Sequence, residues 1–155
     1  MKFHIFTIFP DMYSSTFEEG VIHRGIAKGH VEIFLHNIRD YSSDKHKKVD
    51  DSPFGGGPGM IMKPEPIFNA VETVSKNHNI SKTTPKILLS PQGKQFNHKI
   101  AKELANLSEI ILICGRYEGF DERIRETLAT DEISIGDYIL SGGELASMVI
   151  IDSVS

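Results

Sequence analysis

The chain has 155 residues, of which 39% are hydrophobic and 25% are charged, and its formal net charge is −4. This length supports one domain with a substantial core, and the acidic balance excludes binding to nucleic acid through overall positive charge. No apolar run approaches the roughly 20 residues that span a bilayer, so we expect no membrane segment. One cysteine, Cys114, excludes an internal disulfide and fits a reducing cytoplasm.

The first half of the chain alternates between strand and helix patterns. Residues 2–9 form an apolar run typical of a buried strand, and residues 11–28 have a helical pattern interrupted by glycines. Residues 30–38 alternate apolar and polar side chains with the period of a strand. Residues 39–59 are polar, then glycine-rich, and lack periodicity, which predicts a long loop. Residues 64–77 predict a helix, because their apolar side chains recur on one face and a proline stands at the start.

The second half repeats the alternation more tightly. Strands are predicted at residues 86–90, 109–114 and 132–135, and helices at residues 97–107, 121–129 and 142–154, with Asp121 as a helix cap. Residues 109–114 are apolar on both faces, which indicates a strand in the middle of a sheet. Strand–helix–strand order predicts an α/β fold with a mostly parallel sheet flanked by helices.

Glycine-bearing loops follow the last three predicted strands, at residues 90–93, 115–119 and 136–143. Ligands of parallel sheets bind outside the carboxyl ends of the strands, so these loops are expected to converge on one pocket. The chain contains neither the P-loop motif with its lysine nor the glycine pattern of dinucleotide-binding proteins, which disfavours ATP and NAD. Glycines would instead let a flat ring or a thioether lie against the backbone. S-adenosylmethionine is the leading candidate for such a ligand.

Purely structural interpretations remain open for parts of these loops. Ser141 and Glu144 fit a capping box for the helix that follows, and Tyr138 fits a core position. The run from Arg116 to Gly119 favours function, because a buried strand ends there in a cation, an aromatic ring and a carboxylate. The seven histidines are scattered along the sequence and one cysteine cannot make a cysteine-rich site, so no zinc site is expected.

Four segments together resemble the bacterial tRNA (guanine-N1)-methyltransferase family of the SPOUT superfamily. They are DDSPFGGGPGM at 50–60, LSPQG at 89–93, LICGRYEGFDERI at 112–124 and EISIGDYILSGGELA at 132–146. The family methylates guanosine 37 of tRNA, next to the anticodon, with S-adenosylmethionine. The resemblance implies a C-terminal trefoil knot that holds the cofactor, and a cytoplasmic homodimer with its sites at the subunit interface.

The resemblance also implies roles for individual residues. The implied cofactor-binding residues are Leu89, Ser90, Pro91, Gln92, Gly115, Arg116, Tyr117, Glu118, Gly119, Ser134, Ile135, Gly136, Asp137, Tyr138, Ile139, Leu140, Gly142 and Gly143. The implied substrate residues are Asp50, Asp51, Gly57 and Gly59. Glu118 is expected to support catalysis by orienting the substrate or a magnesium ion. The general base is expected to be an aspartate beyond Ser155, so residues 1–155 would be the catalytic core without the family's C-terminal tRNA-binding domain.

Two alternatives stay open at this point. Another SPOUT methyltransferase, acting on a ribose 2′-hydroxyl or on ribosomal RNA, would share the knot glycines but should lack the GGGPGM segment. A non-enzymatic RNA-binding or dimerisation module would use the glycine loops only for structure. Binding of S-adenosylmethionine separates the second alternative from both enzymes.

Overall fold

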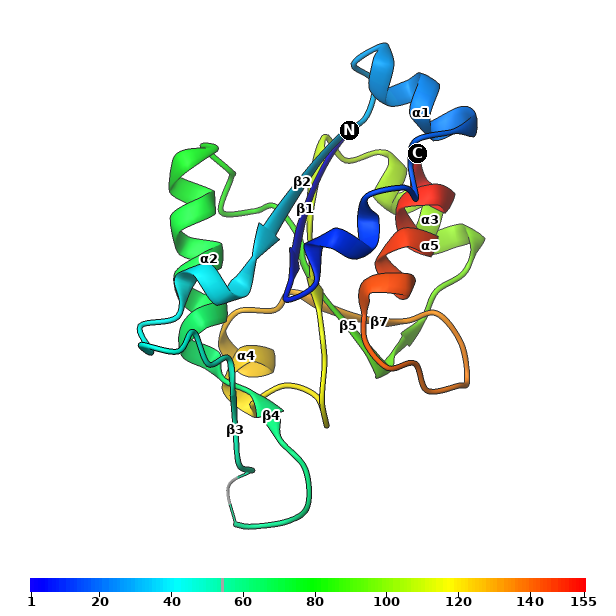
Figure 1. Cartoon of the computed structure of the whole chain (residues 1–155). Coiled ribbons are helices and arrows are strands. Elements are labelled where there is room, and N and C mark those ends of the chain that lie inside the picture. The colour runs from blue at the N-terminus through cyan, green and yellow to red at the C-terminus, as the bar shows by residue number, and fades with distance from the viewer. Residues whose placement is uncertain (54) are drawn as a thin grey trace.

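In residues 1–53 and 55–155, which the computed structural model describes, five parallel strands form the main sheet in the order β2-β1-β6-β5-β7 (Figure 1). Their bounds are β1 (Lys2–Thr7), β2 (Glu32–Asn37), β5 (Lys86–Gln95), β6 (Glu109–Cys114) and β7 (Asp131–Ser134). The sheet confirms the predicted α/β class with its mostly parallel strands. β6 lies in the middle, as its two apolar faces predicted.

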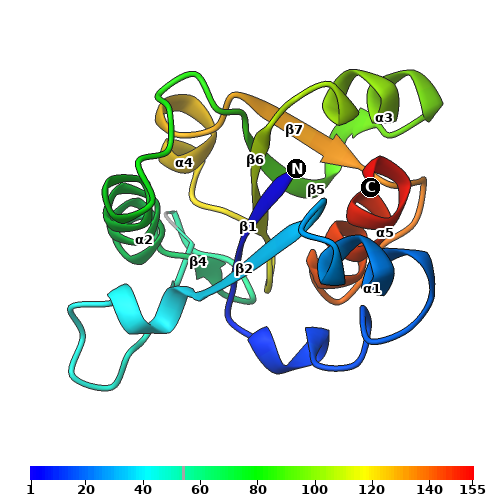
Figure 2. The ribbon, with the colours of Figure 1, turned by 90° about the horizontal axis from the view of Figure 1, so that it is seen from above.

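Helices cover both faces of this sheet, because each parallel connection has to cross over it. The helices are α1 (Gly20–Ala27), α2 (Pro64–Asn77), α3 (His98–Ala105), α4 (Glu122–Thr127) and α5 (Glu144–Val154), with short 3-10 turns η1 (Pro10–Tyr13) and η2 (Ile38–Tyr41). Figure 2 shows α3 and α5 on one side of the sheet and α2 and α4 on the other. Among the described helices, none is both long and apolar enough to cross a bilayer.

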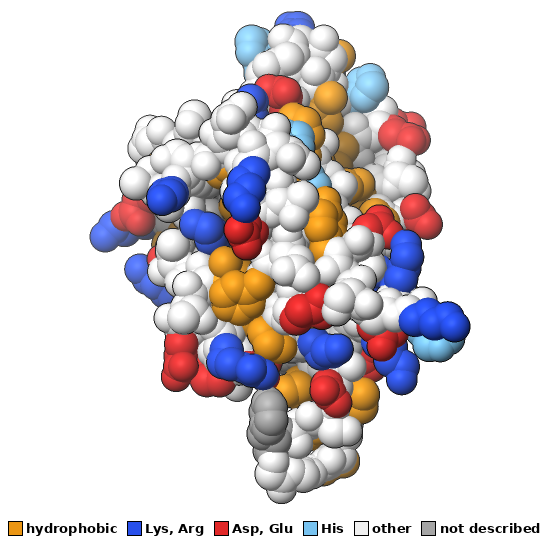
Figure 3. Space-filling view, turned by 90° about the vertical axis from the view of Figure 1, so that its left-hand side faces the viewer, with side chains coloured by type: hydrophobic (Ala, Val, Ile, Leu, Met, Phe, Trp, Pro, Cys, Tyr) orange, Lys and Arg blue, Asp and Glu red, His pale blue; other side chains and the backbone are white. Residues whose placement is uncertain are grey.

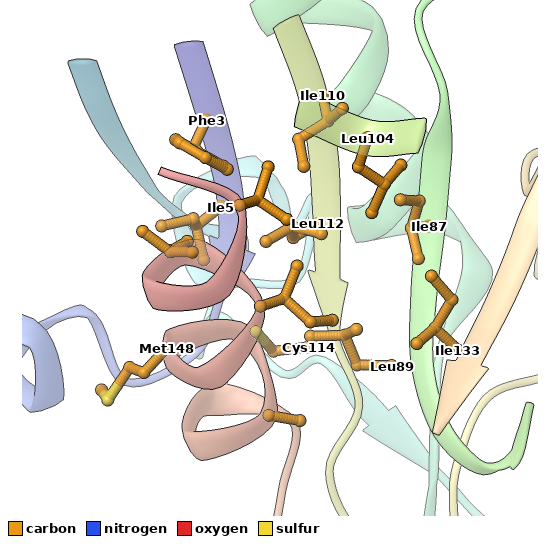
Figure 4. Close-up of a cluster of buried hydrophobic side chains, with 14 of the residues drawn as sticks. Phe3, Ile5, Ile87, Leu89, Leu104, Ile110, Leu112, Cys114, Ile133 and Met148 are labelled. Atoms are coloured by element: carbon orange, nitrogen blue, oxygen red, sulfur yellow. The ribbon is translucent and has the colours of Figure 1, made fainter. Parts of the chain in front are cut away.

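Alternating strand residues supply one core on each face. Ile5 and Leu112 point toward α3 and α5, and Figure 4 shows this cluster continuing across the strands to Ile133. Phe6 and Ile111 point the opposite way, toward α2 and α4. All of these side chains except Ile133, which is 4% exposed, are completely buried. The period-2 alternation of a strand therefore sorts the apolar residues into two layers.

Two predicted elements differ in extent from those observed. The predicted helix at 11–28 is η1 followed by turns and then α1, which begins at Gly20, where φ is +79°. The predicted strand at 86–90 continues to Gln95, because the segment between Leu89 and Lys94 bulges out of the ladder and both of these residues pair with Ile133.

A two-stranded arm projects from the sheet at the lower edge of Figure 1. Its strands β3 (Asp50–Asp51) and β4 (Ile61–Met62) pair antiparallel, so the prediction of an irregular segment at 39–59 was wrong for β3 and η2. Phe54 of the DDSPFGGGPGM segment lies outside the described residues. The trefoil knot implied by the resemblance stays a prediction.

Candidate functional site

The bulged segment of β5 and the loops that follow β6 and β7 surround a cavity of about 320 Å³. Its lining comprises residues 89–92, 115–120, 133–136 and 138–143, with Arg125 and Ala146. A cavity of this size reaches the range of small-molecule sites, which starts at about 300 Å³. The expected convergence of the three glycine loops is confirmed.

All the implied cofactor residues line the cavity except Asp137, whose side chain is exposed at the turn and belongs to no part of the lining. Ser141, which belongs to the predicted loop at 136–143, also lines the cavity, and the lining residues that were not predicted are Phe120, Arg125, Ile133 and Ala146. Phe120 could have been predicted as a lining residue, because it directly follows the GRYEG segment. No sequence pattern pointed to Arg125, because it reaches the cavity from α4 and not from a loop.

Two glycines allow the loops to close on one another. A Cβ atom on Gly143 would lie 2.8 Å from Cα of Cys114 and 3.0 Å from N of Gly115. A Cβ atom on Gly115 would lie 2.9 Å from the Phe120 ring. The Gly143 amide donates to the Gly115 carbonyl at 2.9 Å. The loops after β6 and β7 therefore touch through their backbones, which a larger residue at either glycine would prevent.

Both cations of the described lining are held in ion pairs. Arg116 Nε lies 2.9 Å from Glu144 Oε2, and Arg125 Nε lies 3.0 Å from Glu132 Oε2. A phosphate chain normally needs a cation or a row of free amides to neutralise it. The two arginines of the described lining are therefore already neutralised by carboxylates of the chain.

The capping-box interpretation of Ser141 and Glu144 was wrong. Gly143 is the N-cap of α5, and no side chain caps this helix. The Glu144 carboxylate is fully buried and accepts hydrogen bonds from Thr7 Oγ1 at 2.7 Å and from Arg116 Nε at 2.9 Å. Ser141 contributes its carbonyl, which accepts from Arg116 Nη1 at 3.2 Å. Glu144 therefore fixes Arg116 at the cavity wall, a role with no local signal because its partners lie far away in the sequence.

The turn after β6 brings a carboxylate to the cavity. Tyr117 has φ of +60°, a left-handed conformation that costs a residue with a side chain on the order of 1–3 kcal/mol and that clusters at functional sites. Glu118 is the only carboxylate among the described cavity residues. A Cβ atom on Gly59 would lie 2.5 Å from Glu118 Cγ, so the glycine-rich arm meets the cavity at this carboxylate.

The other implied substrate residues lie farther out on the arm. Asp50 and Asp51 form β3, and Gly57 belongs to the glycine-rich turn; none of the three lines the cavity. Backbone hydrogen bonds anchor the arm, since Met62 N donates to Gly119 O at 2.9 Å and Glu118 N donates to Met60 O at 2.9 Å. The arm and the Glu118 turn are thereby coupled.

Cys114 ends β6 beneath the cavity and is completely buried. Its sulfur lies 3.5 Å from the Tyr13 hydroxyl, which also bonds Ser147 Oγ at 2.5 Å. Burial raises the pKa of the Cys114 thiol to about 12 and raises the pKa of Tyr13 as well.

We expect iodoacetamide at pH 8 to alkylate Cys114 at least about 100-fold more slowly in the folded chain than in guanidinium chloride, because the thiolate is the reactive form. Mass spectrometry of the intact chain measures the extent, and a single cysteine makes the mass shift unambiguous. Equal rates in the two solvents would contradict the burial of this thiol.

Comparisons with known proteins agree on one family. The family model described as tRNA (Guanine-1)-methyltransferase TrmD matches residues 1–155. A tRNA (guanine-N(1)-)-methyltransferase of Dehalococcoides mccartyi is 57% identical over 155 residues, which are 100% of this chain and 62% of that protein. One from Clostridioides difficile is 50% identical, over 100% of this chain and 67% of its own length. The crystal structure of tRNA (m1G37) methyltransferase from Aquifex aeolicus superimposes with a TM-score of 0.89 at 40% identity, covering 99% of this chain and 68% of that one. The chain spans about 62% of the length of the Dehalococcoides relative.

Proposed function

The chain belongs to the tRNA (guanine-1)-methyltransferase family, and from this membership we propose that it transfers a methyl group from S-adenosylmethionine to N1 of guanosine 37 in tRNA. The observation that carries the proposal is the cavity between the bulge of β5 and the loops after β6 and β7, which combines glycine-closed backbone loops with paired cations. These features suit a nucleoside with a thioether-like tail and no phosphate chain.

The cavity residues fit S-adenosylmethionine, which supplies an electrophilic methyl group on sulfur when it is bound. Leu89 and Leu140 would pack against the adenine, and the half-exposed Tyr138 would cover it. The backbone amides and carbonyls near Gly115 and Gly143 would hydrogen-bond the edge of the ring. The loops would thereby hold the reacting groups in line and exclude water from them.

Methylation requires guanine N1 to lose its proton, since the protonated nitrogen is a poor nucleophile. The N1–carbon bond forms as the sulfur–carbon bond breaks, and the proton passes to a general base. We propose that this base is an aspartate in the segment that follows residue 155 in the relatives. Glu118, at the meeting point of cavity and arm, would orient the guanine or hold a magnesium ion, for which a carboxylate is a suitable ligand.

We propose that residues 1–155 are the catalytic domain. The additional segment of the longer relatives is proposed to bind the tRNA. The net charge of −4 supports this division, because residues 1–155 have no overall attraction for a polyanion. The arm with Asp50 and Asp51 would approach the target guanosine. A cytoplasmic location follows from the tRNA substrate.

We further propose a homodimer with its sites at the subunit interface. Exposed apolar side chains beside the cavity support it: Ile139 is 80% exposed, and Leu145 and Val149 on α5 are 48% and 44% exposed. Leu145 and Val149 are one helical turn apart and therefore share a face. A second copy of the chain would bury this face.

Methyl transfer to tRNA tests the proposed function. A chimera of residues 1–155 followed by the remaining segment of the Dehalococcoides relative should form 1-methylguanosine at position 37, as identified by nuclease digestion and mass spectrometry. A transcript with adenosine at that position should stay unmodified. We expect residues 1–155 alone to be at least about 100-fold slower, because the general base is missing.

Different outcomes separate the parts of the proposal. Methylation of a ribose or of another base would contradict the assigned reaction. Full activity of residues 1–155 alone would show that the general base lies within them. Failure of the folded chain to bind S-adenosylmethionine, alone or in the chimera, would contradict the assignment of the cavity.

A further inference from the structure

Three histidines that are scattered in the sequence gather on the α2 face of the sheet. His4 lies on β1, His36 on β2, and His78 directly after α2. One ring nitrogen of each lies within 4.8 Å of those of the other two. Histidines that are dispersed in the sequence thus come together in space, because parallel pairing places β1 beside β2 and the ring contacts of His78 bring the end of α2 to both. Figure 3 shows pale-blue histidine side chains reaching the surface on this side of the molecule, among hydrophobic side chains.

Hydrogen bonds fix the orientation of the buried ring. His4 Nε2 lies 3.1 Å from Glu109 Oε1, and His4 Nδ1 lies 3.1 Å from His36 Nε2. The Glu109 carboxylate only accepts, so the proton of the neutral His4 ring belongs on Nε2, and the Nδ1 lone pair points at His36. A histidine that donates its far N–H to a carboxylate is the usual arrangement of a metal-binding histidine. Thr84 Oγ1, 3.5 Å from the second oxygen of Glu109, helps to hold that carboxylate.

The histidine rings pack against one another and against Phe34. His4 stacks on Phe34 with ring centroids 4.8 Å apart, and His78 meets His4 edge-on at 4.9 Å. Neutral imidazole nitrogens are the ligands that a metal ion needs, and a bound ion would replace the hydrogen bond between His4 Nδ1 and His36 Nε2.

We propose that His4, His36 and His78 bind one divalent transition-metal ion of the zinc class, with Glu109 orienting His4 and water in the fourth position. Zinc–nitrogen distances of about 2.0–2.1 Å place tetrahedral ligand atoms about 3.3 Å apart, close to the observed His4–His36 spacing. His78 is exposed, so its ring is free to close the remaining gap of about 1–2 Å.

This site is separate from the cavity. β2 is the edge strand at the opposite side of the sheet from β7, and none of the three histidines lines the cavity. A bound ion would tie the end of α2 to β1 and β2, which otherwise meet there through ring contacts. Its role is therefore to stabilise this edge of the domain, and it does not depend on methyl transfer.

Zinc titration of the metal-free, tag-free chain tests the proposal. Calorimetry should show one Zn²⁺ per chain, and at 100-fold excess over Kd the midpoint of thermal unfolding should rise by about 5 °C or more. His36→Gln and His78→Gln should each weaken binding at least about 10-fold, as should Glu109→Gln through its effect on His4. His98→Gln, which removes an exposed histidine of α3, is the matched control and should leave the affinity unchanged.

Two further measurements make the test specific. Co²⁺ in place of Zn²⁺ should give the intense visible absorption of a four-coordinate nitrogen site, and excess Mg²⁺ should not displace it, because Mg²⁺ prefers oxygen ligands. Absence of saturable Zn²⁺ binding, or undiminished binding by the His36→Gln/His78→Gln double variant, would overturn the proposal. The cluster would then be a packed group of aromatic rings alone.

Discussion

Replacing Glu144 with alanine should lower the free energy of unfolding by about 3–5 kcal/mol, the cost of removing one partner from a buried ion pair. The Glu144 side chain is 0% exposed and that of Arg116 is 16% exposed, so the Arg116 guanidinium would lose its buried partner with little access to water. Thr7 would also lose its hydrogen-bond acceptor. Urea unfolding followed by circular dichroism measures the change from the midpoint and the slope.

A matched control is available on the surface. Glu103 lies 4.0 Å from Lys99 in an exposed i,i+4 pair, so Glu103→Ala should change the stability by less than about 0.5 kcal/mol. The double variant Glu144→Leu/Arg116→Leu should recover much of the loss, because it leaves no buried charge without a partner. An effect of Glu144→Ala no larger than that of Glu103→Ala would show that the buried pair does not stabilise the domain.

The ion pair between Glu144 and Arg116 also shows which features cannot be predicted from local sequence patterns. Strand β6 and helix α2 were predicted with their observed bounds, because continuous apolar runs and a 3.6-residue period are local signals. The convergence of the three loops followed from the order of strands and helices. Glu144 was misassigned to a cap since a capping box is also a local pattern, whereas its actual partners are Thr7 at the end of β1 and Arg116 in the loop after β6.

The histidine cluster and the bulge in β5 escaped prediction for a related reason. His4 and His36 meet only because β1 and β2 pair in a register that puts both side chains on one face. The strand β5 resumes after Gly93, where a Cβ atom would lie 2.5 Å from N of Ile133, so this glycine is required by contact with a neighbouring strand. Sequence patterns locate elements and loops, but the pairing of distant elements decides which side chains act together.

Replacing Gly143 with alanine should weaken binding of S-adenosylmethionine by at least about 100-fold, or roughly 2.7 kcal/mol. This prediction rests on the proposed cofactor site. The added Cβ would press on Cα of Cys114, on N of Gly115 and on Cβ of Leu89, all at 3.1 Å or less, and Gly115 and Leu89 line the cavity. Because two of them are backbone atoms, the loops have to separate, and the hydrogen bond from Gly143 N to Gly115 O is lost. Calorimetric titration of the purified chain measures the affinity.

Gly25→Ala is the matched control for that substitution. Gly25 lies within α1, where an added Cβ would meet Val31 at an ordinary 3.4 Å, so neither stability nor affinity should fall. Tyr138→Ala probes the same cavity without a steric clash: this side chain is 54% exposed, so the fold should persist while affinity drops by about 5- to 10-fold through lost contact area. If the folded wild-type chain binds the cofactor and Gly143→Ala binds it equally well, the loops after β6 and β7 are not the cofactor wall. If Gly143→Ala no longer binds the cofactor while Tyr138→Ala binds it with reduced affinity, the pocket is formed by the close contact between the loops after β6 and β7.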